Sequence, residues 1–357
     1  MDALRLLLLP FSVVYGLLVW LRNGLYNRGL LKQTGFDIPV IVVGNLAVGG
    51  TGKSPMTEYL VRLLAKRYRV ATLSRGYGRK TRGFREVQPT DTAAESGDEP
   101  LQFKRKFPEI TVAVCEDRVA GVARLRLAGH QVVLLDDAFQ HRALKPGLAI
   151  LLFDYKRMRR PKWLLPAGNY RDWFAARRRA DMLIVTKTPH TAATTEKTHI
   201  ARKLKLDGTA TPVLFAGIDY GMLTPMNRHT TPAFSLPAAG WSVLVVTGIA
   251  NPSPLYDYLG PQVQEIVALR YPDHYPYSPA TAAAIRNRFN AITNPRKLII
   301  TTEKDAQRLA EPALAGPLDG LPIHVVPIRV RFEASDECRI QQLVLDYCED
   351  TLRTASI

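Results

Sequence analysis

The chain has 357 residues, of which 46% are hydrophobic and 22% are charged, and this balance excludes a disordered protein and predicts a folded globular one. Its length suffices for one large domain or two ordinary ones. The 48 lysine and arginine residues against 32 aspartate and glutamate residues give a net charge of +16, which favours polyanionic partners: nucleic acid, anionic lipid headgroups or phosphorylated substrates. The cysteines, Cys115, Cys338 and Cys348, show no metal-ligand spacing, so we expect a reducing compartment.

The N-terminal segment is strongly apolar. Residues 6–21 (LLLLPFSVVYGLLVWL) carry no charge and are flanked by Arg5 and Arg22. This run is shorter than the ~20 residues that a transmembrane helix needs, and residues 1–5 lack the net positive charge of a cleaved signal peptide. Two interpretations remain, a buried core helix and a helix lying in a membrane interface with arginines at the headgroups. We predict the second for residues 1–30, in a peripheral, monotopic protein on the cytoplasmic face of the membrane.

The next part of the chain alternates between strand and helix patterns. Residues 38–43 (IPVIVV) predict a buried parallel strand. A glycine-rich loop follows, and then residues 56–68 have the apolar spacing of an amphipathic helix. Further apolar runs predict strands at residues 70–74, 110–114, 132–136, 149–154 and 182–187. This alternation predicts an α/β domain over residues 31–222, with a parallel sheet covered by helices on both faces.

A second domain is predicted after a Thr/Pro-rich stretch at residues 221–240, where the alternation is interrupted. Residues 241–249, 297–306 and 322–330 supply further strand patterns, so we expect a smaller α/β domain over residues 223–357. The apolar spacing of residues 336–347 predicts that this domain ends with a closing helix.

The glycine-rich loop has the features of a phosphate-binding loop. Such a loop needs glycines that let backbone N–H groups converge, a helix N-terminus behind it, and a lysine for the β- and γ-phosphates. Ala47 stands where the usual pattern has its first glycine, but a residue with a Cβ fits there if its φ is negative. We therefore predict a P-loop NTPase-like domain whose nucleotide-binding residues are Val48, Gly49, Gly50, Thr51, Gly52, Lys53 and Ser54.

Acidic residues follow the loop in two places. Asp136 and Asp137 end an apolar strand, where they either hold Mg²⁺ or cap the next segment; the upstream loop favours Mg²⁺. Asp98 and Glu99 lie in the turn ESGDEP at residues 95–100. This is either a solvated turn or, at the ligand-binding edge of the sheet, the site of a base toward a substrate hydroxyl.

Other candidates are less specific. His274 lies in an aromatic, proline-rich segment and is either structural or a residue that tunes a catalytic aspartate. Three basic clusters, at residues 74–80, 156–162 and 177–179, are typical of solvated surface. Residues 164–172 (LLPAGNYRD) differ, because glycine and proline beside Arg171 indicate an ordered loop that presents a guanidinium.

Together these segments resemble a known family. The chain contains, in the expected order, GNLAVGGTGKSP, SRGYGRK, GDEP, DDAFQH, LLPAGNYRD, PDHY and TEKDA. It is similar in these motifs to the tetraacyldisaccharide 4′-kinases of lipid A biosynthesis in Gram-negative bacteria. The resemblance implies ATP-dependent, Mg²⁺-assisted phosphorylation of the 4′-hydroxyl of tetraacyldisaccharide 1-phosphate, giving lipid IVA at the inner membrane. The partners implied are this lipid and an anionic membrane surface, with neither nucleic acid nor an obligate protein partner.

The resemblance also implies residue roles. Lys53 would bind the β- and γ-phosphates, and Asp98 would be the base toward the 4′-hydroxyl, paired with His274. The metal set it implies is Ser54, Asp136, Asp137 and, near the metal or the base, Glu99. Substrate or transition-state contacts are implied for Tyr77, Arg118, His141 and Arg171. Two departures from the family pattern are Ala138, where the family usually has glycine, and Asp172, where it often has glutamate.

Three other functions remain open from the residues. A P-loop GTPase or regulatory switch usually has an N-K-x-D motif, and residues 186–189 (TKTP) supply the lysine without the aspartate. A nucleic-acid-binding ATPase suits the net charge, but the chain has no recognised nucleic-acid module. A soluble metabolite kinase should remain active without detergent after deletion of residues 1–24. A substrate with four acyl chains, in contrast, cannot leave the bilayer cheaply, at ~0.8 kcal/mol per buried CH₂.

Overall fold

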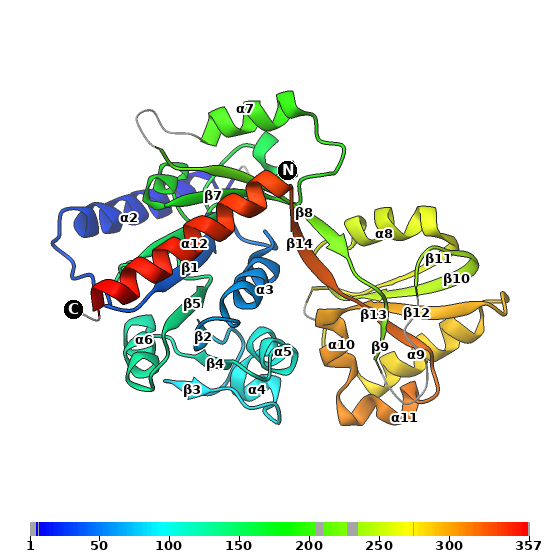
Figure 1. Cartoon of the computed structure of the whole chain (residues 1–357). Helices are drawn as coiled ribbons and strands as arrows, with labels where there is room; N and C mark the ends of the chain where they lie inside the picture. The colour runs from blue at the N-terminus through cyan, green and yellow to red at the C-terminus, as the bar shows by residue number, and fades with distance from the viewer. Residues whose placement is uncertain (1–4, 6, 205–209, 227–234, 274, 356–357) are drawn as a thin grey trace. The chain divides into compact units, whose positions relative to one another are not determined.

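The computed structural model describes residues 5, 7–204, 210–226, 235–273 and 275–355 (Figure 1). The chain forms two compact units. The first comprises Met1–Ile218 together with Val330–Ile357, and the second comprises Asp219–Arg329. The chain therefore enters the second unit once and returns to the first near its C-terminus.

The first unit is built on a nine-stranded sheet with the order β14-β8-β7-β6-β1-β5-β2-β4-β3. Strands β1, β2, β4, β5, β6, β7 and β8 pair in parallel, whereas β3 runs antiparallel to β4. Predicted strands at five places match β2, β4, β5, β6 and β7 to within a residue. The bounds are β1 (Val40–Asn45), β2 (Val70–Ser74), β3 (Arg85–Glu86), β4 (Thr111–Val114), β5 (Val132–Asp136), β6 (Leu148–Asp154), β7 (Met182–Thr186), β8 (Val213–Tyr220) and β14 (Ile328–Phe332).

Helices cover both faces of this sheet, as the unbroken apolar runs of its strands require. In β1, Val40 and Val42 belong to one core cluster, while Ile41 and Val43 belong to the other. The first cluster lies under helices α6 (Arg118–Leu127) and α7 (Thr194–Leu204). The second lies under α3 (Lys53–Leu64), α5 (Asp98–Lys106) and α12 (Ala334–Ala355). Short elements complete the unit: α4 (Ala93–Ser96), η1 (Lys156–Arg159) and η2 (Phe174–Arg179).

The second unit is also α/β. Its five-stranded sheet has the order β11-β10-β12-β13-β9, parallel except for the short antiparallel pair between β13 and β9. Its strands are β9 (Thr224–Pro225), β10 (Ala238–Thr247), β11 (Val263–Arg270), β12 (Lys297–Thr302) and β13 (Ile323–Val326). Its helices are α8 (Ser253–Leu259), η3 (Gly260–Gln262), α9 (Pro279–Asn290), α10 (Glu303–Leu309), η4 (Pro312–Leu314) and α11 (Ala315–Leu318).

The C-terminal helix α12 corrects the predicted domain organisation. The sequence places a closing helix in the second domain, but α12 belongs to the first unit. Its apolar face, with Ile340, Val344 and Cys348 fully buried, packs in the core cluster that also holds α3 (Figure 1). Hydrophobic spacing shows that a helix has a face to bury, but not which sheet buries it.

Gly147, just before β6, lies directly against α12. A Cβ at this position would lie 1.9 Å from the Tyr347 hydroxyl, which accepts a hydrogen bond of 3.1 Å from the Val40 amide. We expect Gly147→Val to lower the free energy of unfolding by about 2 kcal/mol, because the larger side chain displaces α12. Urea unfolding measures this, with Gly35→Val as the control, since Gly35 has nothing within 4 Å of its Cβ position. Equal stability of the two variants would contradict the packing of α12 on β6.

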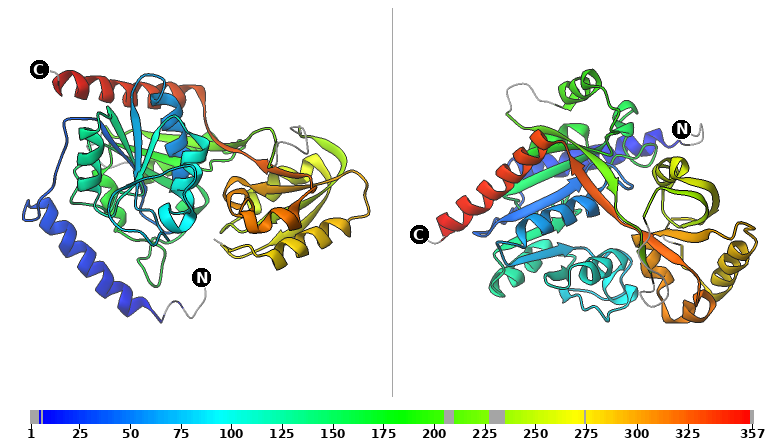
Figure 2. Two further views of the ribbon diagram at one scale, coloured as in Figure 1. Left: turned by 90° about the horizontal axis from the view of Figure 1, so that it is seen from below. Right: turned by 45° about the vertical axis from the view of Figure 1, so that its right-hand side comes forward.

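The N-terminal helix α2 (Leu9–Asn27) is also part of the first unit and not the separate element predicted for residues 1–30. It lies on the side of the large sheet opposite α12 (Figure 2). Its buried residues are Ser12, Gly16 and Val19. A Cβ on Gly16 would lie 2.7 Å from Leu164 and 2.8 Å from Trp173, so only glycine permits this close docking. No helix in the described part of the chain is long and apolar enough to cross a membrane.

Candidate active site

The phosphate loop connects β1 to α3, as predicted. Gly49 and Gly52 have φ values of 94° and 85°, which residues with a Cβ rarely adopt. Among the described residues, Asp137 and Lys187 are the non-glycine positions with positive φ, so Ala47 has ordinary backbone geometry. Ala47 is buried and forms an isolated antiparallel bridge with Tyr170. The alanine therefore fits the loop without strain.

Asn45, the last residue of β1, holds the loop from inside. Its side-chain amide donates to the Ala47 carbonyl and to the Thr51 hydroxyl, both at 2.7 Å. Its own carbonyl accepts a hydrogen bond of 2.8 Å from Gln140. Because Asn45 is fully buried, each of these polar contacts replaces a hydrogen bond to water. This residue was not predicted as part of the site.

Asp137 is the electrostatic centre of the site. Its carboxylate accepts two hydrogen bonds from Arg171, at 3.0 and 2.6 Å, and lies 3.7 Å from the Lys53 ammonium. Burial raises the pKa of the Asp137 carboxyl. The hydrogen bond from Arg171 and the charge of Lys53 together outweigh this effect, so the pKa lies below its usual value. Asp136 immediately precedes it at the end of β5. Asp137 is therefore a carboxylate at neutral pH.

The loop of residues 164–172 is ordered, as its composition predicts, and it contacts two parts of the fold. Toward the phosphate loop, the Asn169 carbonyl accepts from the Val48 amide at 2.8 Å, and Arg171 donates to Asp137 and to the Asn45 side chain. Toward α2, the Arg171 carbonyl accepts from the Tyr15 hydroxyl at 2.8 Å. The structure thus places Arg171 on Asp137 and Asn45, beside the phosphate loop.

Asp172 faces away from the phosphate loop. Its carboxylate is fully buried and accepts from Asn23 of α2 at 2.9 Å and from Arg179 at 2.7 Å. These contacts tie α2 to the first unit. A shorter side chain than glutamate suffices for this anchoring.

Asp98 and Glu99 form the first turn of α5, next to the loop that follows β2. At the start of this helix, Gly97 has a φ of 91°, and a Cβ there would lie 3.0 Å from the Tyr77 carbonyl. The backbones of the two loops therefore touch, and the structure brings Asp98 and Tyr77 to the same edge of the sheet. The Tyr77 side chain is 86% exposed, so it is accessible to a ligand.

Arg118 and His141 lie near this edge and interact electrostatically with each other. Burial and the neighbouring charge of Arg75 lower the pKa of Arg118, against the attraction of Asp137. Burial, together with the charge of Arg118, lowers the pKa of His141, so its neutral form prevails at neutral pH. The positive charge at this edge is therefore carried by arginine.

Comparisons with known proteins show which family the chain belongs to. The model of the family "Tetraacyldisaccharide-1-P 4′-kinase" matches residues 4–347. The tetraacyldisaccharide 4′-kinase of Flavobacterium johnsoniae is 42% identical over 325 residues, which cover 90% of this chain and 93% of that protein. The chain belongs to the tetraacyldisaccharide 4′-kinase family. The family predicted from the sequence motifs is thereby confirmed.

A further relative and a solved structure extend the similarity over nearly the whole chain. The tetraacyldisaccharide 4′-kinase of Phocaeicola vulgatus is 40% identical over 354 residues, covering 98% of this kinase and 96% of that protein. The crystal structure of the "apo" form of LpxK from Aquifex aeolicus in complex with ATP is similar in fold, with a TM-score of 0.71 and 30% identity. That match covers 97% of this chain and 99% of the other.

His274 lies outside the described residues. In the TEKDA motif, Asp305 is fully buried and accepts hydrogen bonds from the Gly248 amide, the Tyr277 hydroxyl and the Thr302 hydroxyl, at 3.0, 3.0 and 2.7 Å. In the part of the chain that the structure describes, no group of three or more His, Cys, Asp or Glu side chains could hold a metal ion.

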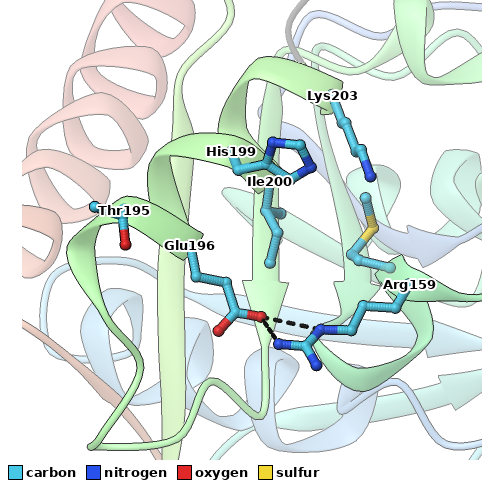
Figure 3. Close-up of a pocket in the computed structure, with 7 residues that line it drawn as sticks. Arg159, Thr195, Glu196, His199, Ile200 and Lys203 are labelled. Atoms are coloured by element: carbon cyan, nitrogen blue, oxygen red, sulfur yellow. Dashed lines mark hydrogen bonds and ion pairs between the residues drawn. The ribbon is translucent and has the colours of Figure 1, made fainter.

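A pocket of about 430 Å³ lies between η1 and α7 and contains none of the predicted site residues (Figure 3). An ion pair between Arg159 and Glu196 crosses it, and His199 and Lys203 line its rim. Arg159 belongs to the basic cluster at residues 156–162 that the sequence predicts as solvated surface. The buried Met158 lines this pocket and also a small cavity beside Ala47 and Thr51 of the phosphate loop.

Proposed function

We propose that this kinase transfers the γ-phosphoryl group of ATP to the 4′-hydroxyl of tetraacyldisaccharide 1-phosphate, giving lipid IVA. The observation that carries the proposal is the β1–loop–α3 unit with Lys53 facing Asp137, in a chain of this family. The test is to incubate the purified protein with ATP, Mg²⁺ and the lipid acceptor, and to measure the mass of the lipid. We expect one added phosphate; consumption of ATP with an unchanged lipid mass would contradict the proposal.

At the nucleotide, the loop of residues 48–54 would bind phosphate oxygens through its backbone N–H groups, aided by the N-terminus of α3. Lys53 would neutralise charge on the β- and γ-phosphates. Mg²⁺ favours a few hard oxygen ligands together with phosphate oxygens, and the Ser54 hydroxyl and the Asp136 carboxylate fit this requirement. Asp137 is engaged by Arg171, which supports a role in orienting Lys53 rather than in binding the metal directly.

At the acceptor, Asp98 is proposed as the base that takes the proton of the 4′-hydroxyl. Its place beside the exposed Tyr77, on the edge that also carries Arg118 and His141, supports this assignment. A neutral His141 suits hydrogen bonding to a sugar hydroxyl, while Arg118 suits the charge of the transferred phosphoryl group. The roles of Glu99 and His274 are proposals from the family resemblance alone.

The outer face of α2 supports association with a membrane surface. Leu17, Leu18 and Trp20 are exposed by 60%, 62% and 60%, although the helix docks through its small and polar residues. A helix that buries Ser12 and Gly16 and exposes leucine and tryptophan is the inverse of an ordinary surface helix. We therefore propose that the kinase is peripherally attached to the cytoplasmic face of the inner membrane, with arginines such as Arg22 near anionic headgroups.

This assignment predicts a change in membrane binding. The double substitution Leu17→Ser with Trp20→Ser should lower binding to vesicles of anionic phospholipid by about 10-fold or more, because two large apolar side chains no longer enter the interface. Sedimentation with vesicles measures the bound fraction. Leu127→Ser is the matched control, since Leu127 of α6 is 81% exposed but lies on another helix. If the control and the double variant bind equally, α2 is not the contact.

A further inference from the structure

Side chains from the ends of β6 and β7 hold the carbonyl groups of the phosphate loop. Arg157 of η1 donates a hydrogen bond of 2.6 Å to the Val48 carbonyl. Lys187, which follows β7, donates to the Gly50 carbonyl. The Thr186 hydroxyl donates to the Thr51 carbonyl at 2.7 Å. Three of the four carbonyls between residues 48 and 51 therefore have a side-chain partner from this edge of the sheet.

These donors are themselves fixed in place. Asp154 at the end of β6 accepts a hydrogen bond of 3.1 Å from the Arg157 amide, and its other oxygen lies 3.0 Å from the Lys187 ammonium. Asp154 is buried, so this ion pair is poorly screened by water. Lys187 has a φ of 56°, a strained conformation for lysine that the surrounding contacts must stabilise.

The guanidinium of Arg157 also explains a glycine. A Cβ on Gly49 would lie 2.8 Å from a terminal nitrogen of Arg157. Gly49 thus serves two needs, a positive φ and the close approach of this arginine. The glycine at position 49 is therefore needed in part because Arg157 packs closely against the outer side of the loop.

The physical consequence concerns the direction of the peptide groups. In a trans peptide the N–H and the C=O point in opposite directions. A loop that binds phosphate must direct its N–H groups inward, and a carbonyl that rotated inward would repel the phosphate. Donors that hold the carbonyls on the outer side therefore keep the N–H groups directed at the phosphates before the nucleotide arrives, which lowers the cost of binding.

We propose that Lys187 and Arg157, with Thr186, are positioning residues that hold the phosphate loop in its binding conformation through its carbonyl groups. The proposal rests on the proposed binding of ATP phosphates in this loop. It assigns a function to Arg157, which was interpreted from the sequence as solvated surface, and to Lys187, which was interpreted as part of an incomplete guanine-binding motif. Neither residue needs to touch the nucleotide for this role.

The test is Lys187→Met, which keeps the length of the side chain and removes its charge and donors. We expect the KM for ATP to rise about 10-fold, the loss expected for a charge-assisted hydrogen bond. The kcat at saturating ATP and the KM for the lipid acceptor should change less than twofold. Lys187→Arg should restore most of the ATP affinity, because a guanidinium can donate to the same carbonyl. A purely structural role would instead lower the melting temperature without a selective effect on ATP.

Two comparisons separate the outcomes. Lys203→Met is the matched control, because Lys203 lines the pocket of Figure 3 and makes no contact with the loop; it should leave the KM for ATP unchanged. Lys53→Met tests the site itself: if that variant binds ATP as tightly as the wild type, the proposed nucleotide site fails. If Lys53→Met loses ATP while Lys187→Met has a wild-type KM for ATP, the site stands and the positioning role is overturned.

Discussion

Replacing Lys53 by methionine is expected to lower kcat/KM for ATP by about 10³-fold. The ammonium of Lys53 lies at the start of α3 and 3.7 Å from Asp137, where it would face the β- and γ-phosphates. Removal of a preorganised charged donor from a shielded site costs about 10²- to 10³-fold in rate, and weaker ground-state binding adds to this loss. Initial rates of lipid phosphorylation over a range of ATP concentrations measure the change.

The control is Lys66→Met, because Lys66 lies just beyond the end of α3 and is exposed to solvent. It should have wild-type kinetics. Folding of Lys53→Met is checked by its melting temperature, since the lysine side chain is partly exposed and its removal leaves Arg171 paired with Asp137. A folded Lys53→Met variant with more than a tenth of the wild-type kcat/KM contradicts the nucleotide site.

Asp98→Asn is expected to lower kcat by about 10²-fold or more while the dissociation constant for ATP stays within twofold of wild type. Loss of a general base typically costs about 10²- to 10⁴-fold in rate. Asp98 lies in the first turn of α5, beside the Tyr77 loop, and not on the phosphate loop, so nucleotide binding should not depend on it. Asparagine keeps the size of the side chain and its ability to accept a hydrogen bond.

Single-turnover rates and equilibrium binding of ATP distinguish the two effects. Glu109→Gln is a suitable control, because this acid lies just beyond the same helix and is exposed. An Asp98→Asn variant with wild-type turnover removes Asp98 from the mechanism. A variant that loses ATP affinity as much as turnover would instead place this acid at the nucleotide or its metal.

Features encoded by short segments were predictable from the sequence. The strand of residues 38–43, the glycine loop and the following helix are consecutive, and each has a local signature of β-branched residues, glycines or helical spacing. Asp98 and Asp136 were proposed as site acids on similar grounds, because Asp98 lies in a short turn motif and Asp136 ends an apolar run; the structure places Asp98 at the start of α5 and Asp136 at the end of β5. The prediction that the phosphate loop accommodates an alanine at position 47 is also confirmed, since Ala47 has no positive φ.

Features that depend on distant packing were not predictable. Arg171 meets Asp137 across 34 positions of sequence, and no local pattern identifies that pair. Lys187 was interpreted only as part of an incomplete guanine-binding motif. Its contact with Gly50 spans 137 positions of sequence, so no local pattern predicts it. The unit in which α12 packs was likewise not predictable, since its apolar face could be buried against either sheet.

The docking face of the N-terminal helix could have been predicted from the sequence. Ser12, Gly16, Val19 and Asn23 recur at helical spacing on one face of an otherwise apolar segment. A stripe of small and polar residues at spacings of three and four marks a docking face on a helix whose other residues are large and apolar. This stripe contacts Leu164, Trp173 and Asp172, while the leucines and Trp20 are exposed.

The most direct measurement follows the γ-phosphoryl group itself. ATP labelled with ¹⁸O in this group is incubated with Mg²⁺, vesicles containing tetraacyldisaccharide 1-phosphate, and the wild-type, Lys53→Met or Asp98→Asn protein. With the wild type we expect the labelled phosphoryl group on the 4′-oxygen of the lipid, with a mass that accounts for one added phosphate, and at least 10²-fold slower transfer with either variant. Release of the label as inorganic phosphate without lipid product, or equal transfer by all three proteins, would contradict the assignment of this site.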